Sequence, residues 1–296
     1  MALKIGFVGL GMMGKPMALR LLGRGFPLGV HNRTREKAKE LLDKGAQWCE
    51  SPKSLMEESD VVISMVSDSR SLDEVTDGGQ GTLAGVSPGK VHIDMSTVSP
   101  VTTEKLGQAF RKKQAFFLHA PVLGSVPQAT DGTLLIFVGG DRETAHRCEP
   151  VFNVLGKRVW YFDEITKASH MKLICNLFIA SMVAVLSEGL VFGQKVGIPA
   201  RTILEILKDS ALAAPTYQTK GEAILRRDFS ARFMVTHMLK DVNLILDAAG
   251  AAGVPLPAVE AIRQLYSDAS ANGFGREDYS AVIKVLEQAA NVVVKS

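Results

Sequence analysis

The chain has 296 residues, of which 46% are hydrophobic and 22% are charged. These proportions exclude a chain that is disordered throughout, and at roughly 150 residues per domain the length favours two domains. A net charge of +3 is too small for binding nucleic acid through a general basic field. Three cysteines without a CxxC pair argue against a disulfide framework or a cysteine zinc site. They indicate a reducing compartment, which we expect to be the cytoplasm.

Short apolar runs alternate with helical patterns in the first part of the chain. Strands are predicted at residues 3–8, 28–31, 61–65, 91–93, 116–119 and 134–138, with helices at about 13–25 and 35–44. This alternation indicates βαβ units and a parallel sheet. The uninterrupted apolar runs are typical of strands that are buried on both faces.

The character of the sequence changes near residue 163. Beyond it, apolar residues recur at helical spacing, with breaks at 197–199, 215, 253–257 and 272–273, and one long helix is expected at about 166–196. Its apolar stretch at 173–186 is too short for a membrane span and is interpreted as a buried helix of a soluble protein. We therefore predict an α/β fold: a Rossmann-type doubly wound parallel sheet in residues 1–163, followed by an all-helical domain in residues 164–296.

A glycine motif follows the first predicted strand. The run Gly9-Leu10-Gly11-Met12-Met13-Gly14 is a G-x-G-x-x-G that opens a predicted helix, the context in which this motif binds a dinucleotide. Gly9 would permit the tight turn, Gly11 the approach of a pyrophosphate and Gly14 the close packing of helix on strand. The alternative is a glycine-rich turn that binds nothing.

The second predicted strand ends in His31-Asn32-Arg33-Thr34. A site for NAD would place a carboxylate here, whereas Arg33 and Lys37 suit a 2′-phosphate. The sequence therefore favours NADP(H) over NAD(H). The alternative is that Thr34 only caps the next helix and that Arg33 is solvated.

Lys172 opens the most apolar helix of the chain. Asn176 lies four residues later, so both side chains project from one helical face, which Ser169 shares. An apolar pocket can lower the pKa of a lysine toward neutrality and make it usable as an acid or base. The alternatives are a salt bridge at an interface or a snorkelling stem. We find no histidine pattern of a metal site and predict no metal.

Five segments in order along the chain resemble the β-hydroxyacid dehydrogenase family. Besides the N-terminal glycine motif they are Asp94-Met95-Ser96-Thr97, Ala120-Pro121-Val122-Leu123-Gly124, Lys172-Leu173-Ile174-Cys175-Asn176 and Lys240-Asp241. The family includes 3-hydroxyisobutyrate dehydrogenases and semialdehyde reductases, and Asn32-Arg33-Thr34 resembles its NADPH-using glyoxylate/succinic semialdehyde reductase branch. The resemblance spans nearly the whole chain.

The resemblance implies a role for each matching residue. Lys172 would be the catalytic general acid/base, and Asn176 would orient the substrate. The cofactor would be bound by Gly9, Leu10, Gly11, Met12, Met13, Asn32, Arg33, Thr34, Val66, Ser67, Ser96, Thr97 and Lys240. The substrate would be bound by Ser96, Leu123, Gly124, Ser125, Lys172, Asn176 and Asp241. The alternatives are that Ser96 and Thr97 cap a helix starting near Val101, and that Lys240 and Asp241 are a surface pair.

Two segments depart from the family pattern. The family usually reads P-V-S-G-G where this chain has Leu123, so one hydroxyl donor to a substrate carboxylate is missing; Ser125 is a candidate replacement. Residues 166–171, ahead of the catalytic lysine, lack the family's glycines. Both departures bear on the substrate and not on the cofactor.

The expected activity is an NADPH-dependent interconversion of a small aldehyde or keto acid and its hydroxy acid. A second reading, suggested by Leu123, is a reductase of uncharged carbonyls or imines, and a third is a non-catalytic cofactor-binding scaffold or sensor. The long apolar helix, together with the resemblance, predicts a homodimer or homotetramer through the C-terminal domain. Neither nucleic acid nor a membrane is expected as a partner.

Overall fold

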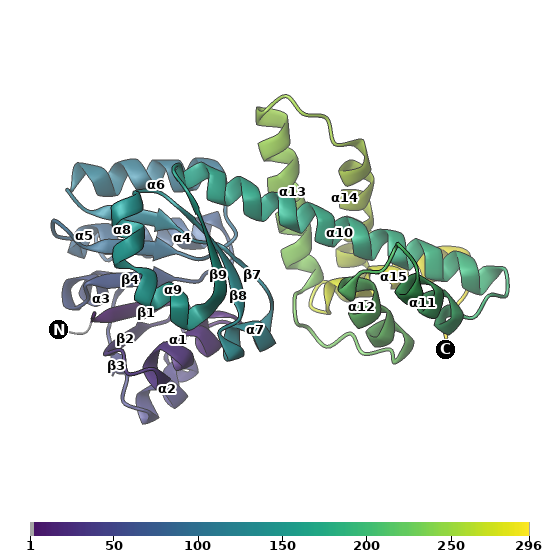
Figure 1. Ribbon diagram of the computed structural model, residues 1–296, viewed down its shortest axis with the longest axis horizontal. Coiled ribbons are helices and arrows are strands. Elements are labelled where there is room, and N and C mark those ends of the chain that lie inside the picture. The colour runs from purple at the N-terminus through teal and green to yellow at the C-terminus, as the bar shows by residue number, and fades with distance from the viewer. Residues whose placement is uncertain (1–2, 296) are drawn as a thin grey trace. The chain divides into compact units, whose positions relative to one another are not determined.

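The computed structural model describes residues 3–295, which form a sheet of nine strands followed by a helical region (Figure 1). The chain divides into two compact units, one ending at Lys172 and the other beginning at Leu173. This division falls inside a helix that starts close to the boundary predicted at residue 163. The predicted fold class is confirmed, because a largely parallel sheet with its helices precedes the helical region.

The first unit is built on a sheet with the strand order β3-β2-β1-β4-β5-β6-β8-β7, and β9 pairs with β8. The strands from β3 to β6 in this order are all parallel. The strands are β1 (Ile5–Val8), β2 (Leu28–His31), β3 (Gln47–Trp48), β4 (Val61–Ser64), β5 (Val91–Asp94), β6 (Phe116–His119), β7 (Val122–Leu123), β8 (Leu134–Gly139) and β9 (Gly156–Phe162).

The sheet is not parallel throughout, which corrects the prediction for its far edge. β8 runs antiparallel to β6 and β7. Only a short helix, α7 (Val126–Asp131), joins β7 to β8, and Gly132 ends it with φ +65°. So short a connection returns the chain in the opposite direction, whereas parallel neighbours need a longer crossover.

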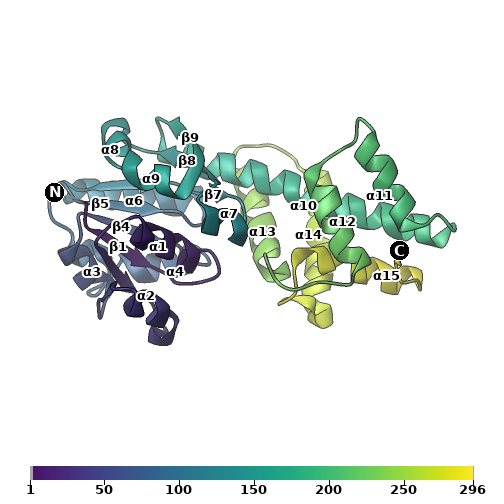
Figure 2. The same cartoon turned by 60° about the horizontal axis from the view of Figure 1, so that its bottom comes forward.

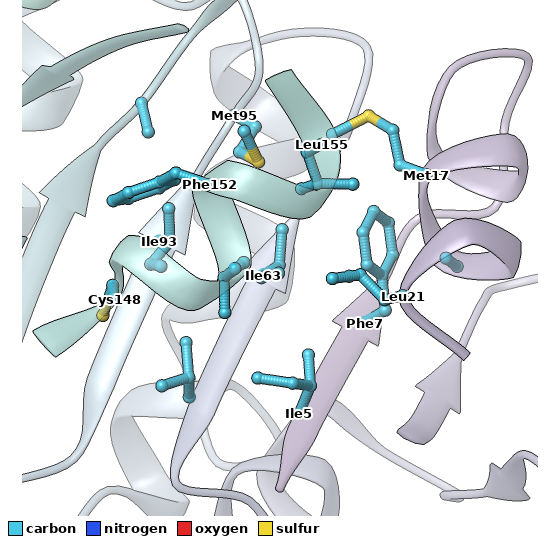
Figure 3. Packing of buried hydrophobic residues seen from close by; sticks show 14 of the residues in the cluster. Ile5, Phe7, Met17, Leu21, Ile63, Ile93, Met95, Cys148, Phe152 and Leu155 are labelled. Carbon is cyan, nitrogen blue, oxygen red and sulfur yellow. The ribbon is translucent and has the colours of Figure 1, made fainter. Parts of the chain in front are cut away.

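Helices cover both faces of the sheet. On one side, α1 and α9 pack on β1, β4 and β5; Figure 3 shows this core, where Ile5, Phe7, Ile63 and Ile93 meet Met17, Leu21, Phe152 and Leu155. On the other side, α3, α4 and α6 cover Val8 and Val62. Besides α7, the helices of this unit are α1 (Gly14–Gly23), η1 (Arg35–Ala38), α2 (Lys39–Asp43), α3 (Pro52–Glu58), α4 (Ser69–Thr76), α5 (Thr82–Gly85), α6 (Pro100–Lys112), α8 (Arg142–Arg147) and α9 (Glu149–Leu155).

The second unit is helical, and no strand follows β9 in the part of the chain that the structure describes. Helices α13 and α14 pack against each other, as do α11 and α12 (Figures 1 and 2). The long helix α10 (Ile165–Lys195) is followed by α11 (Ala200–Asp209), α12 (Pro215–Leu225), α13 (Val235–Ala251), α14 (Pro257–Ala269), the π-helical η2 (Ser270–Phe274), the 3-10 helix η3 (Tyr279–Val282) and α15 (Ile283–Ala290).

Helix α10 is long and apolar enough to cross a membrane by length and composition, a test that the core helix of a soluble protein also passes. One side of it is buried in the core of the second unit, through residues such as Val183 and Leu190. Another side is exposed and apolar: Ile174, Phe178, Val185 and Phe192 are between 47% and 70% exposed. Their spacing of four and seven residues places them in one stripe, called here the α10 stripe.

Candidate active site

The candidate residues of the first unit gather at the carboxyl edge of the sheet. The last residues of five parallel strands are in register there, in the order His31, Val8, Ser64, Asp94 and His119. Each candidate segment follows one of these strands directly. This edge is where doubly wound sheets bind their ligands, so the topology itself brings the predicted segments together.

The glycine motif forms the tight turn that its spacing predicts. Gly9 has φ +94°, and a Cβ there would overlap the carbonyl oxygen of Met65. A Cβ on Gly14 would overlap the carbonyl oxygen of Gly9, so this glycine lets α1 start directly against the turn. Gly11 differs, because it is exposed and a Cβ there would meet nothing within 4 Å.

The difference between Gly14 and Gly11 allows an experiment to distinguish an effect on folding from an effect on cofactor binding. We expect Gly14→Ala to lower the melting temperature, because the turn must move to admit the methyl group. Gly11→Ala should leave the melting temperature unchanged but weaken the binding of NADPH, because its methyl group occupies the approach of the pyrophosphate. Thermal unfolding and a fluorescence titration with NADPH check both variants. Undiminished binding by Gly11→Ala would refute the assignment of this loop to the cofactor.

Asn32 ties the glycine loop to the end of β2. Its Oδ1 accepts a hydrogen bond from the backbone N–H of Leu10 at 2.9 Å, and its Nδ2 donates to the carbonyl oxygen of Thr34 at 2.8 Å. The side chain therefore fixes the loop and the following segment relative to each other. Its role is to shape the loop, whatever the ligand.

The basic residues after β2 face solvent. Arg33 and Lys37 are exposed, and neither forms an ion pair with any residue described in the structure. By contrast, Arg35 lies 3.7 Å from Glu50 and over the ring of Trp48. Thr34 occupies the N-cap position of η1, but its side chain makes no capping hydrogen bond. The interpretation of Thr34 as a helix-capping side chain is therefore wrong.

Ser96 is held firmly at the end of β5. Its hydroxyl donates to Asp94 Oδ1 at 2.7 Å and accepts from the backbone N–H of Val66 at 2.9 Å. The helix that follows is α6, whose cap is Ser99. Ser96 and Thr97 therefore do not cap it. Val66 and Ser67 follow β4, so both loops lie at the same edge.

Asp94 is the buried acceptor of this region. Its Oδ1 also accepts from the hydroxyl of Ser64 at 2.6 Å, and Ser64 Oγ in turn lies 2.9 Å from His92 Nε2. Burial alone would raise the pKa of Asp94, but His119 and the two hydroxyls hold it below its ordinary value. Burial also lowers the pKa of His92 to about 4, against the opposing charge of Asp94. His92 is accordingly neutral at neutral pH.

The predicted substrate segment follows β6 and includes β7. Leu123 is partly buried, and Gly124 has φ +142°. The backbone N–H of Ser125 donates to Gln128 Oε1 at 2.9 Å, which forms part of the cap of α7. That N–H is therefore already used within the protein.

Lys172 lies in the second turn of α10 and is only 8% exposed. Ser169, one turn earlier, is buried as well. Burial at this level excludes a fully solvated lysine, and a buried lysine needs a polar reason to be there. His170 points away from this buried side, because it is exposed.

In the second unit, three predicted residues form one polar group. Asn176 Nδ2 donates to Asp241 Oδ2 at 2.5 Å, and Lys240 Nζ lies 2.9 Å from Asp241 Oδ1. Asn176 and Asp241 are both at most 2% exposed. Asp241 is therefore no surface residue, and the interpretation of Lys240 and Asp241 as an ordinary surface pair is wrong. Among the residues that the structure describes, no group of three or more His, Cys, Asp and Glu could hold a metal ion.

Comparison with known proteins assigns the chain to a family. Residues 4–163 match the NAD binding domain of 6-phosphogluconate dehydrogenase, and residues 166–286 match the NAD-binding region of NADP-dependent 3-hydroxyisobutyrate dehydrogenase. Glyoxylate/succinic semialdehyde reductase 1 of Arabidopsis thaliana is 37% identical over 286 residues, which are 96% of this chain and 99% of the relative. The chain belongs to the β-hydroxyacid dehydrogenase family. The resemblance found in the sequence is confirmed.

Solved structures agree with this assignment to the β-hydroxyacid dehydrogenases. A 3-hydroxyisobutyrate dehydrogenase from Salmonella typhimurium is 25% identical with a TM-score of 0.87, covering 96% of this chain and 99% of its own. Psf3, solved in complex with NADP+ and 2-OPP, is 26% identical with a TM-score of 0.87 and covers 95% of this chain and 99% of its own. As a member of this family, the protein is an NAD(P)-dependent oxidoreductase.

Asp94 and Ser64 were not predicted as site residues of this β-hydroxyacid dehydrogenase. Asp94 accepts hydrogen bonds from both Ser64 and the predicted residue Ser96. Asp94 stands within a segment of the family resemblance, but only Ser96 and Thr97 of that segment were assigned a role. A carboxylate that ends a fully buried parallel strand is the feature of the sequence that could have revealed it, because such a charge needs buried donors.

Proposed function

We propose that the protein is an NADPH-dependent reductase that interconverts a small aldehyde or keto acid, of the semialdehyde or glyoxylate type, and the corresponding hydroxy acid. One observation carries the proposal: the side chain of Lys172 is buried on α10, four residues before the buried amide of Asn176. A buried lysine one helical turn before a fixed amide is suited to transferring a proton to a small polar substrate.

Lys172 and Asn176 have different roles toward the substrate. In reduction, the nicotinamide supplies the hydride when bound, and Lys172 gives a proton from Nζ to the oxygen of the developing alkoxide. Asn176 orients the substrate, and its own orientation is set by the hydrogen bond to Asp241 Oδ2. In oxidation, Lys172 takes the proton back.

The preference for NADPH rests on the segment after β2. Arg33 and Lys37 are exposed basic residues without carboxylate partners in the described chain, and Arg33 offers a fork suited to a 2′-phosphate. The glycine turn suits the pyrophosphate, because Gly9 and Gly14 allow the tight turn against the start of α1 and Gly11 leaves its exposed side open. The complex of Psf3 with NADP+ supports the same choice.

The substrate class is tested by following the oxidation of NADPH with glyoxylate, succinic semialdehyde, methylmalonate semialdehyde, tartronate semialdehyde, an uncharged aldehyde and a cyclic imine. Turnover of one of the acids supports the proposal. Turnover confined to the uncharged compounds would favour the second candidate function, a reductase of uncharged carbonyls or imines. No turnover of any compound, with NADPH still bound, would favour a cofactor-binding scaffold or sensor.

Leu123 is the observation that favours the second candidate, and it makes a prediction of its own. Leu123→Ser should raise kcat/KM for the acid substrates by about tenfold or more, because a hydrogen bond to a charged group contributes about 1.5–3 kcal/mol. The backbone N–H of Ser125 cannot supply this bond, since it donates to Gln128. Leu123→Ala is the matched control, which opens the same space without a hydroxyl. An equal gain in both variants would show that the effect is steric.

The α10 stripe supports the proposal of a homodimer or homotetramer. Its large apolar side chains would be covered by the same stripe of a second copy. We expect light scattering to give a multiple of the mass of one chain, and the double variant Phe178→Glu, Phe192→Glu to give the mass of one chain. Val101→Glu is the control, because Val101 is an equally exposed apolar residue on α6. A wild-type mass equal to one chain would overturn the proposal.

A further inference from the structure

His119 lies at the centre of a buried polar network in the first unit. It ends β6, its side chain is 1% exposed, and both ring nitrogens have polar neighbours. Nε2 is 3.1 Å from the carbonyl oxygen of Ser96 and 3.4 Å from Asp94 Oδ2. Nδ1 is 2.8 Å from the hydroxyl of Ser169 on α10. The ring therefore joins the loop after β5 to the helix that carries Lys172.

The network continues beyond Ser169. The hydroxyl oxygen of Ser169 is 3.1 Å from that of Thr103 on α6, and the hydroxyl of Thr103 donates to the carbonyl oxygen of Pro100 at 2.9 Å. Asp94, Ser96, Thr103, His119 and Ser169 are all at most 1% exposed. Polar groups buried this deeply must satisfy one another, so their hydrogens can be counted.

The contacts fix the hydrogen on one side of the imidazole of His119. The Ser96 carbonyl and the Asp94 carboxylate only accept, so Nε2 must carry a hydrogen. On the other side, the hydroxyl of Ser169 can donate to Nδ1 and accept from the hydroxyl of Thr103, which also lies within reach of the carbonyl oxygen of Pro100. A ring with its hydrogen on Nε2 therefore joins the loop after β5 to α10 through both of its nitrogens.

We propose that His119 is a positioning residue: with its ring between Asp94 and Ser169, it holds the loop that carries Ser96 and the first turns of α10 in one fixed arrangement, and thereby places Lys172. The inference rests on the role of Lys172 in the proposed function. Ser169 precedes Lys172 by one helical turn, so the hydrogen bond between Ser169 and the ring acts close to the reacting group. Small displacements of a reacting group are costly, since a misplacement of about 1 Å can lower a rate about 100-fold.

Two variants separate the two sides of the ring. The amide nitrogen of Gln at position 119 reaches the region of Nε2, whereas that of Asn reaches the region of Nδ1. His119→Gln therefore keeps the side toward Asp94 and loses Ser169, and His119→Asn does the reverse. We expect Ser169→Ala and His119→Gln each to lower kcat about tenfold or more without changing the Kd of NADPH. We expect His119→Asn to retain more of kcat than His119→Gln, although it is less stable.

A coupling test shows whether the two residues act through one contact. Ser169→Ala should cause no further loss of kcat in the His119→Gln background, because the contact is already gone. Ser187→Ala is the matched control, since Ser187 is a buried hydroxyl on the same helix that donates to the carbonyl oxygen of Val183. Additive losses in the double variant, or an unchanged kcat in Ser169→Ala, would overturn the positioning role.

The hydrogen on Nε2 is measured without turnover. In wild-type protein labelled with 15N-histidine, we expect Nε2 of His119 to give the signal of a protonated nitrogen, identified by its loss in His119→Asn. The signal of an unprotonated nitrogen at Nε2 would overturn the inference. The test is separable from that of the proposed function: wild-type turnover by Lys172→Ala would refute the proposed function. Wild-type turnover by Ser169→Ala, with Lys172→Ala inactive, would refute the role of His119 alone.

Discussion

Lys172→Ala is expected to lower kcat by about 10²–10⁴-fold, the range that general acid–base catalysis contributes. The binding of NADPH should be unchanged, because the residues of the first unit that are expected to hold the cofactor lie in the loops after β1, β2, β4 and β5. Stopped-flow measurement of the hydride-transfer step, with a parallel fluorescence titration of NADPH, separates the chemical step from binding.

Lys167→Ala is the control for this variant. Lys167 lies on the same helix, but it is exposed and pairs with Asp163 and Glu164. We expect it to keep wild-type turnover. A loss of kcat of similar size in both variants would indicate a general disturbance of α10, and full activity of Lys172→Ala would show that another group supplies the proton.

Arg33→Glu should raise the Kd of NADPH by about 10- to 100-fold while leaving the Kd of NADH nearly unchanged. A charge-assisted hydrogen bond contributes about 1.5–3 kcal/mol, and a carboxylate at this position would in addition repel the 2′-phosphate. The same carboxylate can accept a hydrogen bond from the 2′-hydroxyl of NADH. Titration of both cofactors on the wild type and the variant measures the change in their ratio.

Arg35→Glu provides the control for charge, because it makes the same change two residues later. Arg35 is exposed but lies near Glu50 and Trp48, so we expect only a small effect of the changed field. An equal rise in the Kd of NADPH in both variants would assign the effect to the overall charge of this surface. An equal rise in the Kd of NADPH and of NADH in Arg33→Glu would show that Arg33 shapes the loop without contacting the 2′-phosphate.

The regular parts of the fold followed from the sequence. The strands Leu28–His31 and Phe116–His119 have the predicted bounds, and α10 begins and ends within one residue of the prediction. The helix is long and each strand is a largely apolar run that ends at a polar residue, so local pattern dominates. β3 and β7 have two residues each, too few to form a pattern, and β9 contains the charged pair Lys157 and Arg158. The predicted helix at 35–44 is divided into η1 and α2.

The candidate site was predictable where chemistry follows a continuous motif. The glycine turn and the segment after β2 are such motifs, and their geometry agrees with the spacing. The network of Asp94, His119 and Ser169 joins three elements that are far apart in the sequence, so only the fold reveals it. The same holds for the burial of Asp241, which an amphipathic pattern alone does not distinguish from exposure.

The two side-chain hydrogen bonds of Asn32 have a consequence for how such a protein can change over generations. Asn32 maintains the shape of the glycine loop, and the side chains at 33 and 37 point into solvent without taking part in those hydrogen bonds. Substitutions at these neighbouring positions therefore leave the loop intact. Selection can exchange one cofactor for the other by small steps, each of which passes through a protein that still folds its dinucleotide loop.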